Sequence, residues 1–313
     1  MVRVAVTGTT GYLGRFVVDS LLNAGHTVAA QVRSTLNTPD PLTTYDSELE
    51  FFCGDMEDVA SLEALVDQCD AVVHMAFMSA TGSYRGGEGA DPTWFWEQNF
   101  CGTLRLLRAC QTAKVAKFVF LSSRAVFDGC HIKDRPVEDT DEPIPVNHYG
   151  LLKLAGEQLA RLYDDMTFCS LRPTGVYGLT WPRTRTKWWN LVTDTPTNDR
   201  DLSSFSNKVF TEVHGADVAS AVLLLLQQEH SDIHRRAFNC SDISVSEQYL
   251  VRKCQILLDG PSGDLVDDQL QPPINNMGTT GLNRLGWQGG GVKKLNETLQ
   301  EMKEISKQLE QSA

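Results

Sequence analysis

The chain has 313 residues, of which 42% are hydrophobic, enough to bury the core of one large domain or two smaller ones. Its formal net charge of −12 has the wrong sign for a protein that binds nucleic acid or an anionic membrane surface. The sequence opens without the apolar segment of a signal peptide, and no later stretch is apolar enough to span a bilayer. We therefore expect a soluble, cytoplasmic protein.

Neither the cysteines nor the histidines indicate a metal site. The eight cysteines contain no Cys-x-x-Cys pair, which favours reduced, mostly buried thiols over a zinc site or a set of disulfides. His230 and His234 share a helical spacing, but no third ligand lies near them in the sequence. We predict no bound metal.

A glycine turn follows the first predicted strand. Residues 2–6 are largely apolar and lead into Thr7-Gly8-Thr-Thr-Gly11-Tyr-Leu-Gly14, after which apolar residues recur with helical spacing. Strand, glycine turn and helix in this order place a pyrophosphate at a helix N-terminus, where free N–H groups favour an anion. Gly8 would allow the tight turn, Gly11 the close approach of the phosphates, and Gly14 the packing of helix on strand.

The second predicted strand, 27–32, ends in Arg33. In a dinucleotide site an acidic residue at this place binds the ribose hydroxyls, whereas an arginine suits a 2′-phosphate. The sequence therefore favours NADP over NAD, with a solvent-facing arginine as the alternative.

Further strands and helices alternate along the first half of the chain. Strands are predicted at 49–53, 70–75 and 117–121, and helices at 59–66 and from Asp91 to about residue 113, with a glycine-rich loop at 82–89. Asp91 and Pro92 are typical of an N-cap and a first helical position. This alternation predicts an α/β protein with a parallel sheet covered on both faces.

Tyr149 and Lys153 are four residues apart in a predicted helix, so their side chains lie on one face. An ammonium group close to a phenol favours the phenolate, which makes the tyrosine a proton donor or acceptor near neutral pH. Alone this pair is weak evidence, because both residues are common and helices place many such pairs at random.

Together the motifs resemble the extended short-chain dehydrogenase/reductases. The matching features are, in order, Thr7-Gly-x-x-Gly-x-x-Gly14, Asp55, His74-x-Ala76, Asn99, Ser122-Ser123 and Tyr149-x-x-x-Lys153. Segments 126–129 and 149–157 look most like dTDP-4-dehydrorhamnose reductases, with nucleotide-sugar epimerases close behind. The match is dense only to about residue 178.

The resemblance implies a catalytic group. Ser123 would hold the carbonyl oxygen of the substrate, with Ser122 as the fallback. Tyr149 would pass a proton to that oxygen, and Lys153 would bind the nicotinamide ribose and keep the phenol acidic. Asn99 would hold a water in the proton relay.

The resemblance also implies a fold, a cofactor site and an assembly. The fold is a Rossmann-type, doubly wound parallel sheet over 1–178, with returning segments near 205–240, and a smaller C-terminal α/β substrate lobe over 179–313. A homodimer through the helices at 91–113 and 147–164 is expected. The implied cofactor-binding residues are Gly8, Thr10, Gly11, Tyr12, Leu13, Gly14, Arg33, Asp55, Met56, Met75, Ala76, Phe77, Ser122, Tyr149, Lys153, Arg172, Pro173 and Thr174.

Departures from the family pattern narrow the reaction. Dehydratases of the superfamily have acidic residues directly after the catalytic serine or threonine, whereas this chain has Arg124 and Ala125, which disfavours dehydration.

We expect an NADP-dependent oxidoreductase that reduces a keto group on a nucleotide-linked deoxysugar, with Tyr149 as proton donor. The alternatives are a nucleotide-sugar 4-epimerase with tightly bound NAD and a reductase of a small free ketone or aldehyde. Retention of Ser123, Tyr149 and Lys153 argues against a non-catalytic binding subunit.

The second half of the chain is less informative. Arg183 and Arg185, in a cationic and aromatic cluster over 181–189, could grip a nucleotide diphosphate while a tryptophan stacks on the base or sugar. A solvated loop or a subunit contact is the alternative. The expected substrate contacts are Ser123, Arg124, Arg183 and Arg185.

Asp217 is expected to cap a helix at 214–229. Beyond it we expect a strand at 237–240, a helix at 245–258, a loop at 259–281 and an amphipathic helix over 295–309 that packs on its own domain.

Overall fold

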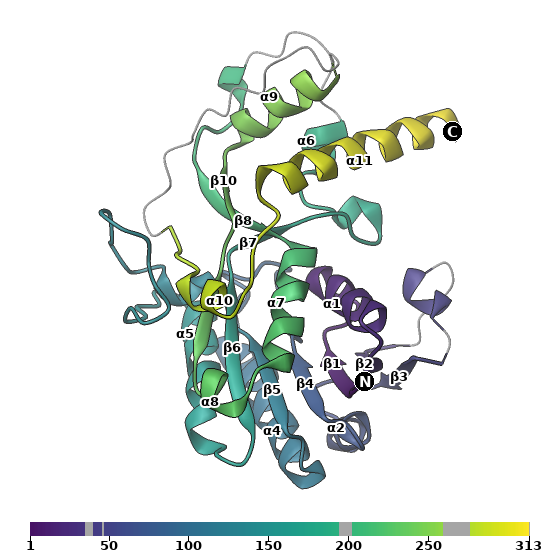
Figure 1. Ribbon diagram of the computed structural model, residues 1–313, viewed down its shortest axis with the longest axis vertical. Coiled ribbons are helices and arrows are strands. Elements are labelled where there is room, and N and C mark those ends of the chain that lie inside the picture. Colours follow the sequence, from purple (N-terminus) through teal and green to yellow (C-terminus); the bar gives the residue numbers. More distant parts are fainter. Residues whose placement is uncertain (35–39, 46, 194–201, 259–275, 313) are drawn as a thin grey trace.

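A seven-stranded parallel sheet organises the structure. The computed structural model describes residues 1–34, 40–45, 47–193, 202–258 and 276–312 (Figure 1). The strands lie in the order β3-β2-β1-β4-β5-β6-β9, and the direction of winding reverses between β1 and β4. Ligands of such sheets bind at the carboxyl ends of the strands beside this reversal. The strands are β1 (Arg3–Thr7), β2 (Thr27–Val32), β3 (Leu49–Cys53), β4 (Ala71–His74), β5 (Lys117–Leu121), β6 (Thr167–Pro173) and β9 (Ala237–Cys240).

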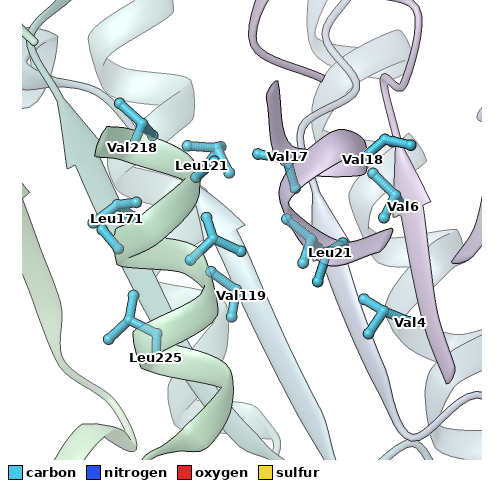
Figure 2. Close-up of a cluster of buried hydrophobic side chains, with 14 of the residues drawn as sticks. Val4, Val6, Val17, Val18, Leu21, Val119, Leu121, Leu171, Val218 and Leu225 are labelled. Atoms are coloured by element: carbon cyan, nitrogen blue, oxygen red, sulfur yellow. The ribbon is translucent and has the colours of Figure 1, made fainter. Parts of the chain in front are cut away.

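Helices cover both faces of this sheet. Successive side chains of a strand point to opposite faces, so Val4 and Val6 pack under α1 (Tyr12–Asn23) and α7 (Gly215–Gln227), whereas Ala5 faces α2 (Val59–Val66) and α4 (Gly102–Ala113). Figure 2 shows the first layer, in which apolar residues of α1 and α7 meet those of β1, β5 and β6. The predicted Rossmann-type fold is confirmed.

The long helix predicted from Asp91 to about residue 113 forms in three parts. Asp91 caps it by accepting a hydrogen bond from the Trp94 amide at 2.9 Å. A short helix, α3 (Pro92–Trp96), passes through a π-helical turn, η2 (Glu97–Cys101), into α4. Such turns insert one extra residue into a helix and are frequent at functional sites. The turn brings Asn99 towards the end of β4.

The helix that carries Tyr149 is α5 (His148–Gln158), shorter than the predicted 147–164. Asn147 caps it, since its Oδ1 atom accepts from the Gly150 amide at 2.8 Å. A 3-10 turn, η4 (Leu159–Leu162), continues the chain. Another 3-10 turn, η3 (Arg124–Phe127), follows β5 and leads towards α5.

A second, three-stranded sheet lies beyond the carboxyl ends of the main sheet, in the upper half of Figure 1. In the order β10-β8-β7, strand β8 (Phe210–His214) pairs parallel with β7 (Gly175–Tyr177) and antiparallel with β10 (Ile243–Val245). The sequence patterns predicted none of these strands. The helices α6 (Trp189–Thr193), α9 (Glu247–Leu258) and α11 (Gly291–Ser312) pack with them around one core. The division of the chain at residue 178 stays a prediction.

Short elements complete the description of the chain. Most of the loop predicted at 259–281 lies outside the described residues, but its last part contains a bridge between Met277 and Val137 and the start of α10. The short elements elsewhere in the chain are η1 (Pro41–Thr44), η5 (Arg183–Arg185), η6 (Leu202–Ser204) and α8 (His230–Ile233), and α10 spans Thr280–Arg284.

Asp217 does not cap α7, so that prediction is wrong. His214 is the cap, because its Nδ1 atom accepts from the Ala216 amide at 3.1 Å. Asp217 lies one turn further on and faces α11, where it accepts from the Gly290 amide at 2.9 Å and from Lys294 Nζ at 2.7 Å. It therefore joins the starts of α7 and α11.

The C-terminal helix α11 packs on its own domain, as predicted. Leu295, Leu299 and Met302 are fully buried in the core beneath the second sheet, because their spacing keeps them on one face of the helix. Among the described residues no helix, α11 included, combines the length and apolar character needed to cross a bilayer.

Candidate active site

The glycine turn has the shape that its sequence predicts. Gly8 has φ of +76°, and a Cβ there would lie 2.8 Å from the Ala76 nitrogen, so no other residue fits without strain. A Cβ on Gly14 would collide with the carbonyl oxygen of Gly8, so this glycine packs against the turn itself. Gly11 begins α1 without a side-chain cap. The first N–H groups of α1 therefore have no side chain in front of them at the end of β1.

Thr7 joins the ends of β1 and β4 at the reversal of the sheet. Its Oγ1 atom accepts from the Met75 and Ala76 amides at 3.2 and 3.1 Å and contacts His74 Nδ1 at 2.7 Å. His74 Nε2 lies 2.9 Å from Thr103 Oγ1 on α4. Burial lowers the pKa of His74 to about 3, so the ring is neutral. The glycine motif did not predict this role of Thr7, although a polar residue at the end of an apolar strand is a signal for it.

Ser123, Tyr149 and Lys153 come together at the end of β5. Ser123 caps η3 by accepting from the Ala125 amide at 3.1 Å, and its side chain lies near enough to that of Tyr149 to lower the pKa of the phenol. Lys153 Nζ donates to the Leu121 carbonyl at 2.7 Å and lies 5.9 Å from the centre of the Tyr149 ring. All three side chains are buried. The structure thus places the predicted proton donor beside the predicted oxygen-binding hydroxyl.

Burial sets the protonation of this group. It raises the pKa of Tyr149, and the nearby Ser123 side chain offsets this only in part. Burial also lowers the pKa of Lys153 to about 7, opposed by the charge of Glu157. The lysine therefore does not give the acidic phenol that the sequence spacing predicts. In this structure Tyr149 is protonated at neutral pH and can act as a donor.

Ser122 and Arg172 belong to a buried network rather than to a ligand site. Arg172 pairs with Glu157 through two bonds, Nε to Oε1 at 2.8 Å and Nη2 to Oε2 at 2.6 Å. Ser122 donates to the same carboxylate. The cofactor role predicted for these two side chains is therefore not supported by their positions. Pro173 ends β6, and the described residues offer the buried Thr174 hydroxyl no hydrogen-bond partner.

Asn99 fixes the chain after β4. Its Oδ1 atom accepts from the Met78 amide at 2.7 Å, and its Nδ2 atom donates to the carbonyls of Met78 and Phe95, both at 2.9 Å. Both N–H groups of the amide are thus used by the backbone. The side chain keeps one lone pair of Oδ1 for a further hydrogen bond, and its role in a proton relay stays a prediction.

The ends of β2 and β3 carry the residues predicted to select the cofactor. Arg33 is exposed, and its Nη1 atom contacts Met78 Sδ at 3.5 Å, which places it beside the segment after β4. Asp55 is exposed, and its Oδ1 atom accepts from the Glu57 amide at 2.8 Å. Met56 is buried against α4. Arg33 and Asp55 are thus accessible at the carboxyl edge of the sheet, whereas Met56 is core.

Tyr12 connects the glycine turn to the second lobe. Its hydroxyl donates to the Gly178 carbonyl at 2.6 Å and accepts from the Lys187 amide at 3.2 Å. Leu13 packs on the core beneath α1, and Thr10 is half-buried in the turn. The segment that contains Arg183 and Arg185 is therefore held next to the start of α1.

Two of the three tryptophans of 181–189, Trp188 and Trp189, pack against the core of the second sheet. Trp188 stacks on Tyr177 with ring centres 5.2 Å apart, and Trp189 packs in the same cluster, so neither is free to stack on a base. Arg183 is half-buried and donates to the Thr180 carbonyl at 3.3 Å, whereas Arg185 is exposed.

Arg124 lies largely buried beside the catalytic serine. Its Nη2 atom is 4.0 Å from Asp128 Oδ1, and no described residue accepts a hydrogen bond from its Nε atom. Burial lowers the pKa of Arg124, although the guanidinium stays charged at neutral pH. A buried donor without a partner is costly, so the Nε atom lowers the stability of this arrangement.

Residues 4–241 match the model of the NAD-dependent epimerase/dehydratase family. The chain belongs to this family. The family agrees with the short-chain dehydrogenase/reductase type that the sequence motifs predicted, whereas the predicted preference for NADP is not confirmed. The finer resemblance to dTDP-4-dehydrorhamnose reductases stays a prediction.

The relatives include several UDP-glucose 4-epimerases. The Vibrio cholerae enzyme is 30% identical over 281 residues, which cover 84% of this chain and 77% of the relative. The Lacticaseibacillus casei enzyme is 32% identical over 180 residues, covering 56% and 52%. A 3 beta-hydroxysteroid dehydrogenase/Delta 5-->4-isomerase of Mycobacterium tuberculosis is 32% identical over 191 residues, covering 56% and 47%. The chain thus spans about half the length of the last two relatives.

Solved structures show the same fold. UDP-glucose 4-epimerase of Thermotoga maritima, solved with UDP-glucose, has a TM-score of 0.74 at 21% identity and covers 98% of this chain and 99% of its own. The Stenotrophomonas maltophila enzyme, solved with NAD and formylated UDP-arabinopyranose, has a TM-score of 0.76 at 22% identity, with both chains fully covered. At these identities the likeness establishes the fold alone.

Proposed function

We propose that the protein is a nucleotide-sugar 4-epimerase that retains NAD, with a UDP-hexose as substrate. The observation that carries the proposal is the match to the Vibrio cholerae UDP-glucose 4-epimerase over 84% of the chain. The joint placement of Ser123, Tyr149 and Lys153 at the end of β5 supports it. We prefer this alternative to the NADP-dependent reductase favoured by the sequence because the family is NAD-dependent.

The residues at the carboxyl edge of the sheet fit a dinucleotide. The cradle around Gly8 leaves no room for a Cβ, and the start of α1 presents N–H groups to an anion. Gly11 and Tyr12 would hold the pyrophosphate, Asp55 would approach the adenosine, and Lys153 would bind the nicotinamide ribose. When bound, NAD supplies the acceptor and donor of a hydride.

The side chains supply the proton transfers. Tyr149 takes the proton from the sugar hydroxyl that is oxidised and returns it to the same oxygen when the carbon is reduced from its other face. Ser123 holds that oxygen through its hydroxyl. The first step needs Tyr149 as the phenolate, a form that its burial disfavours and that a charged Lys153 beside it would favour. The cycle returns both proton and hydride, so it needs no external reductant.

A reductase that uses NADP is the second candidate, and Arg33 favours it. Its guanidinium is exposed at the end of β2, and the contact with Met78 Sδ uses only Nη1. The remaining N–H groups suit a 2′-phosphate.

The nucleotide that the protein retains decides between the two candidates. We expect denatured protein to release close to one equivalent of NAD, and the intact protein to interconvert UDP-glucose and UDP-galactose without added cofactor. Tyr149→Phe should lower turnover by about 10²- to 10⁴-fold, whereas Tyr163→Phe, outside the site, should not. Empty protein that prefers NADPH and reduces keto sugars would replace the epimerase with the reductase.

A further inference from the structure

The glycine-rich loop, residues 79–89 between β4 and α3, is a closed structure with a free tip. The Ala80 amide donates to the Gly87 carbonyl at 2.8 Å, and Ser79 Oγ donates to the Ser83 carbonyl at 2.6 Å. Gly82 and Gly86 have φ of +77° and +74°, and a Cβ on either would meet no described atom within 4 Å. The loop therefore holds its own shape while its tip projects into open space, so it can move as a unit.

This loop covers the catalytic tyrosine. The Tyr84 ring stacks on the Tyr149 ring with centres 5.4 Å apart and planes 28° from parallel. Phe77 lies against both rings, 5.7 Å from Tyr84 and edge-on at 5.1 Å from Tyr149. Tyr84 is 59% exposed, whereas Tyr149 is 7% exposed. Tyr84 thus has one face on the catalytic ring and the other towards solvent.

An ion pair holds the loop in this position. Arg85 donates to Asp128 through Nε at 2.6 Å and through Nη2 at 2.8 Å. The Asp128 carboxylate also accepts from Asn147 Nδ2 at 3.2 Å, and Asn147 caps α5, the helix that carries Tyr149. One carboxylate therefore ties the loop to the N-terminus of the catalytic helix. A two-pronged Arg–carboxylate pair fixes orientation as well as distance.

Proton transfer requires a substrate oxygen within about 3 Å of the Tyr149 hydroxyl. In the structure, the rings of Tyr84 and Phe77 both pack against the Tyr149 ring. A sugar therefore cannot lie over the Tyr149 ring while Tyr84 is stacked on it. The loop must therefore swing away to admit the sugar, and it can then return over the bound ring. Lids of this kind exclude water and orient the substrate.

We propose that the glycine-rich loop is a lid over Tyr149, and that Tyr84 is the residue of the lid that packs against the sugar. The ion pair between Arg85 and Asp128 is its latch. The identity of the sugar rests on the proposed function, whereas the latch does not. Tyr84 offers an apolar ring face to the C–H face of a pyranose, in the way that aromatic side chains recognise flat apolar surfaces.

Arg85→Ala tests the latch by amide hydrogen exchange in the whole protein, without substrate. The 79–89 segment should exchange about three- to tenfold faster, as expected from losing a partly exposed ion pair. Arg135→Ala is the matched control, because Arg135 makes the same two-pronged pair with Asp141, at 2.7 and 2.6 Å, away from the loop. Unchanged exchange of the loop in Arg85→Ala would overturn the latch. Asp128 is left intact because it also supports the cap of α5.

Two substitutions of Tyr84 test its contact with the sugar. Tyr84→Ala should raise KM for UDP-glucose at least about tenfold and leave the retained NAD in place, while Tyr84→Phe should restore KM because the contact needs only the ring. Equal KM for Tyr84→Ala and the unchanged protein would overturn the contact. If no variant turns over UDP-glucose but Arg85→Ala still frees the loop, the proposed substrate falls and the latch stands.

Discussion

Replacing Ser122 or Ser123 by alanine should affect different properties of the protein. Ser122→Ala should mainly lower stability, and Ser123→Ala should mainly lower kcat. Ser122 donates to the buried carboxylate of Glu157, so Ser122→Ala should lower the free energy of unfolding by about 1.5–3 kcal/mol and leave kcat within a small factor. Ser123 lies beside Tyr149, and in the proposed reaction its hydroxyl holds the substrate oxygen on which charge develops. Ser123→Ala should lower kcat by about 10²- to 10³-fold, equivalent to about 2.7–4 kcal/mol, the usual cost of removing one such donor.

Urea unfolding and initial rates of UDP-glucose epimerisation measure the two effects on the same preparations. The stability change in Ser123→Ala should stay near 1 kcal/mol, since its hydroxyl also accepts from the Ala125 amide as a cap. The assignment would be refuted if Ser122→Ala lost as much kcat as Ser123→Ala while the fold stayed intact. Ser123→Thr, which keeps a hydroxyl, should retain far more activity than Ser123→Ala.

Three further predictions concern stability and assembly. His74 binds a proton in the unfolded chain but not in the folded protein, where it is buried. The free energy of unfolding should therefore fall as the pH drops from 6.5 towards 3, by about 2 kcal/mol at pH 5. His74→Asn should lose this part of the pH dependence when its unfolding is measured at pH 7 and at pH 5. Asp217→Asn, which breaks the pair with Lys294, should cost about 1–3 kcal/mol in the same unfolding assay, and equal stability would contradict its role as a tie between α7 and α11. If the protein is a homodimer through the helices predicted at 91–113 and 147–164, Leu151→Asp should yield a monomer in equilibrium sedimentation, because Leu151 in α5 is 48% exposed and Leu162 in η4 is 70% exposed. A monomeric parent protein would refute that interface.

Local sequence patterns predicted most of the main sheet. Residues 27–32, 49–53, 117–121 and 237–240 form strands with the predicted bounds, because apolar runs between turn signals need no distant partner to be recognised. The strands of the second sheet escaped prediction for the opposite reason. Strand β8 contains Glu212, a charged residue that the structure buries by pairing it with Lys187. That pair joins residues 25 apart, which no periodicity reveals.

The sequence also located the glycine turn and the Tyr149–Lys153 pair, since both depend on spacing within one element. The resemblance assigned Ser123 with Ser122 as the fallback, and the structure shows that the two side chains point to different partners, since Ser122 donates to Glu157 and Ser123 caps η3. Position along the chain likewise did not show that Asn99 makes three hydrogen bonds to backbone atoms.

Long-range contacts decided the rest of the site. The sequence alone determined the family and the parallel sheet, because both depend on local order and spacing. Only the tertiary structure placed Tyr84 on Tyr149, 65 positions later in the chain, and turned Glu157 towards Arg172 and Ser122. Burial, which depends on the whole fold, then set the protonation of Tyr149 and Lys153 against the direction that their spacing alone predicts.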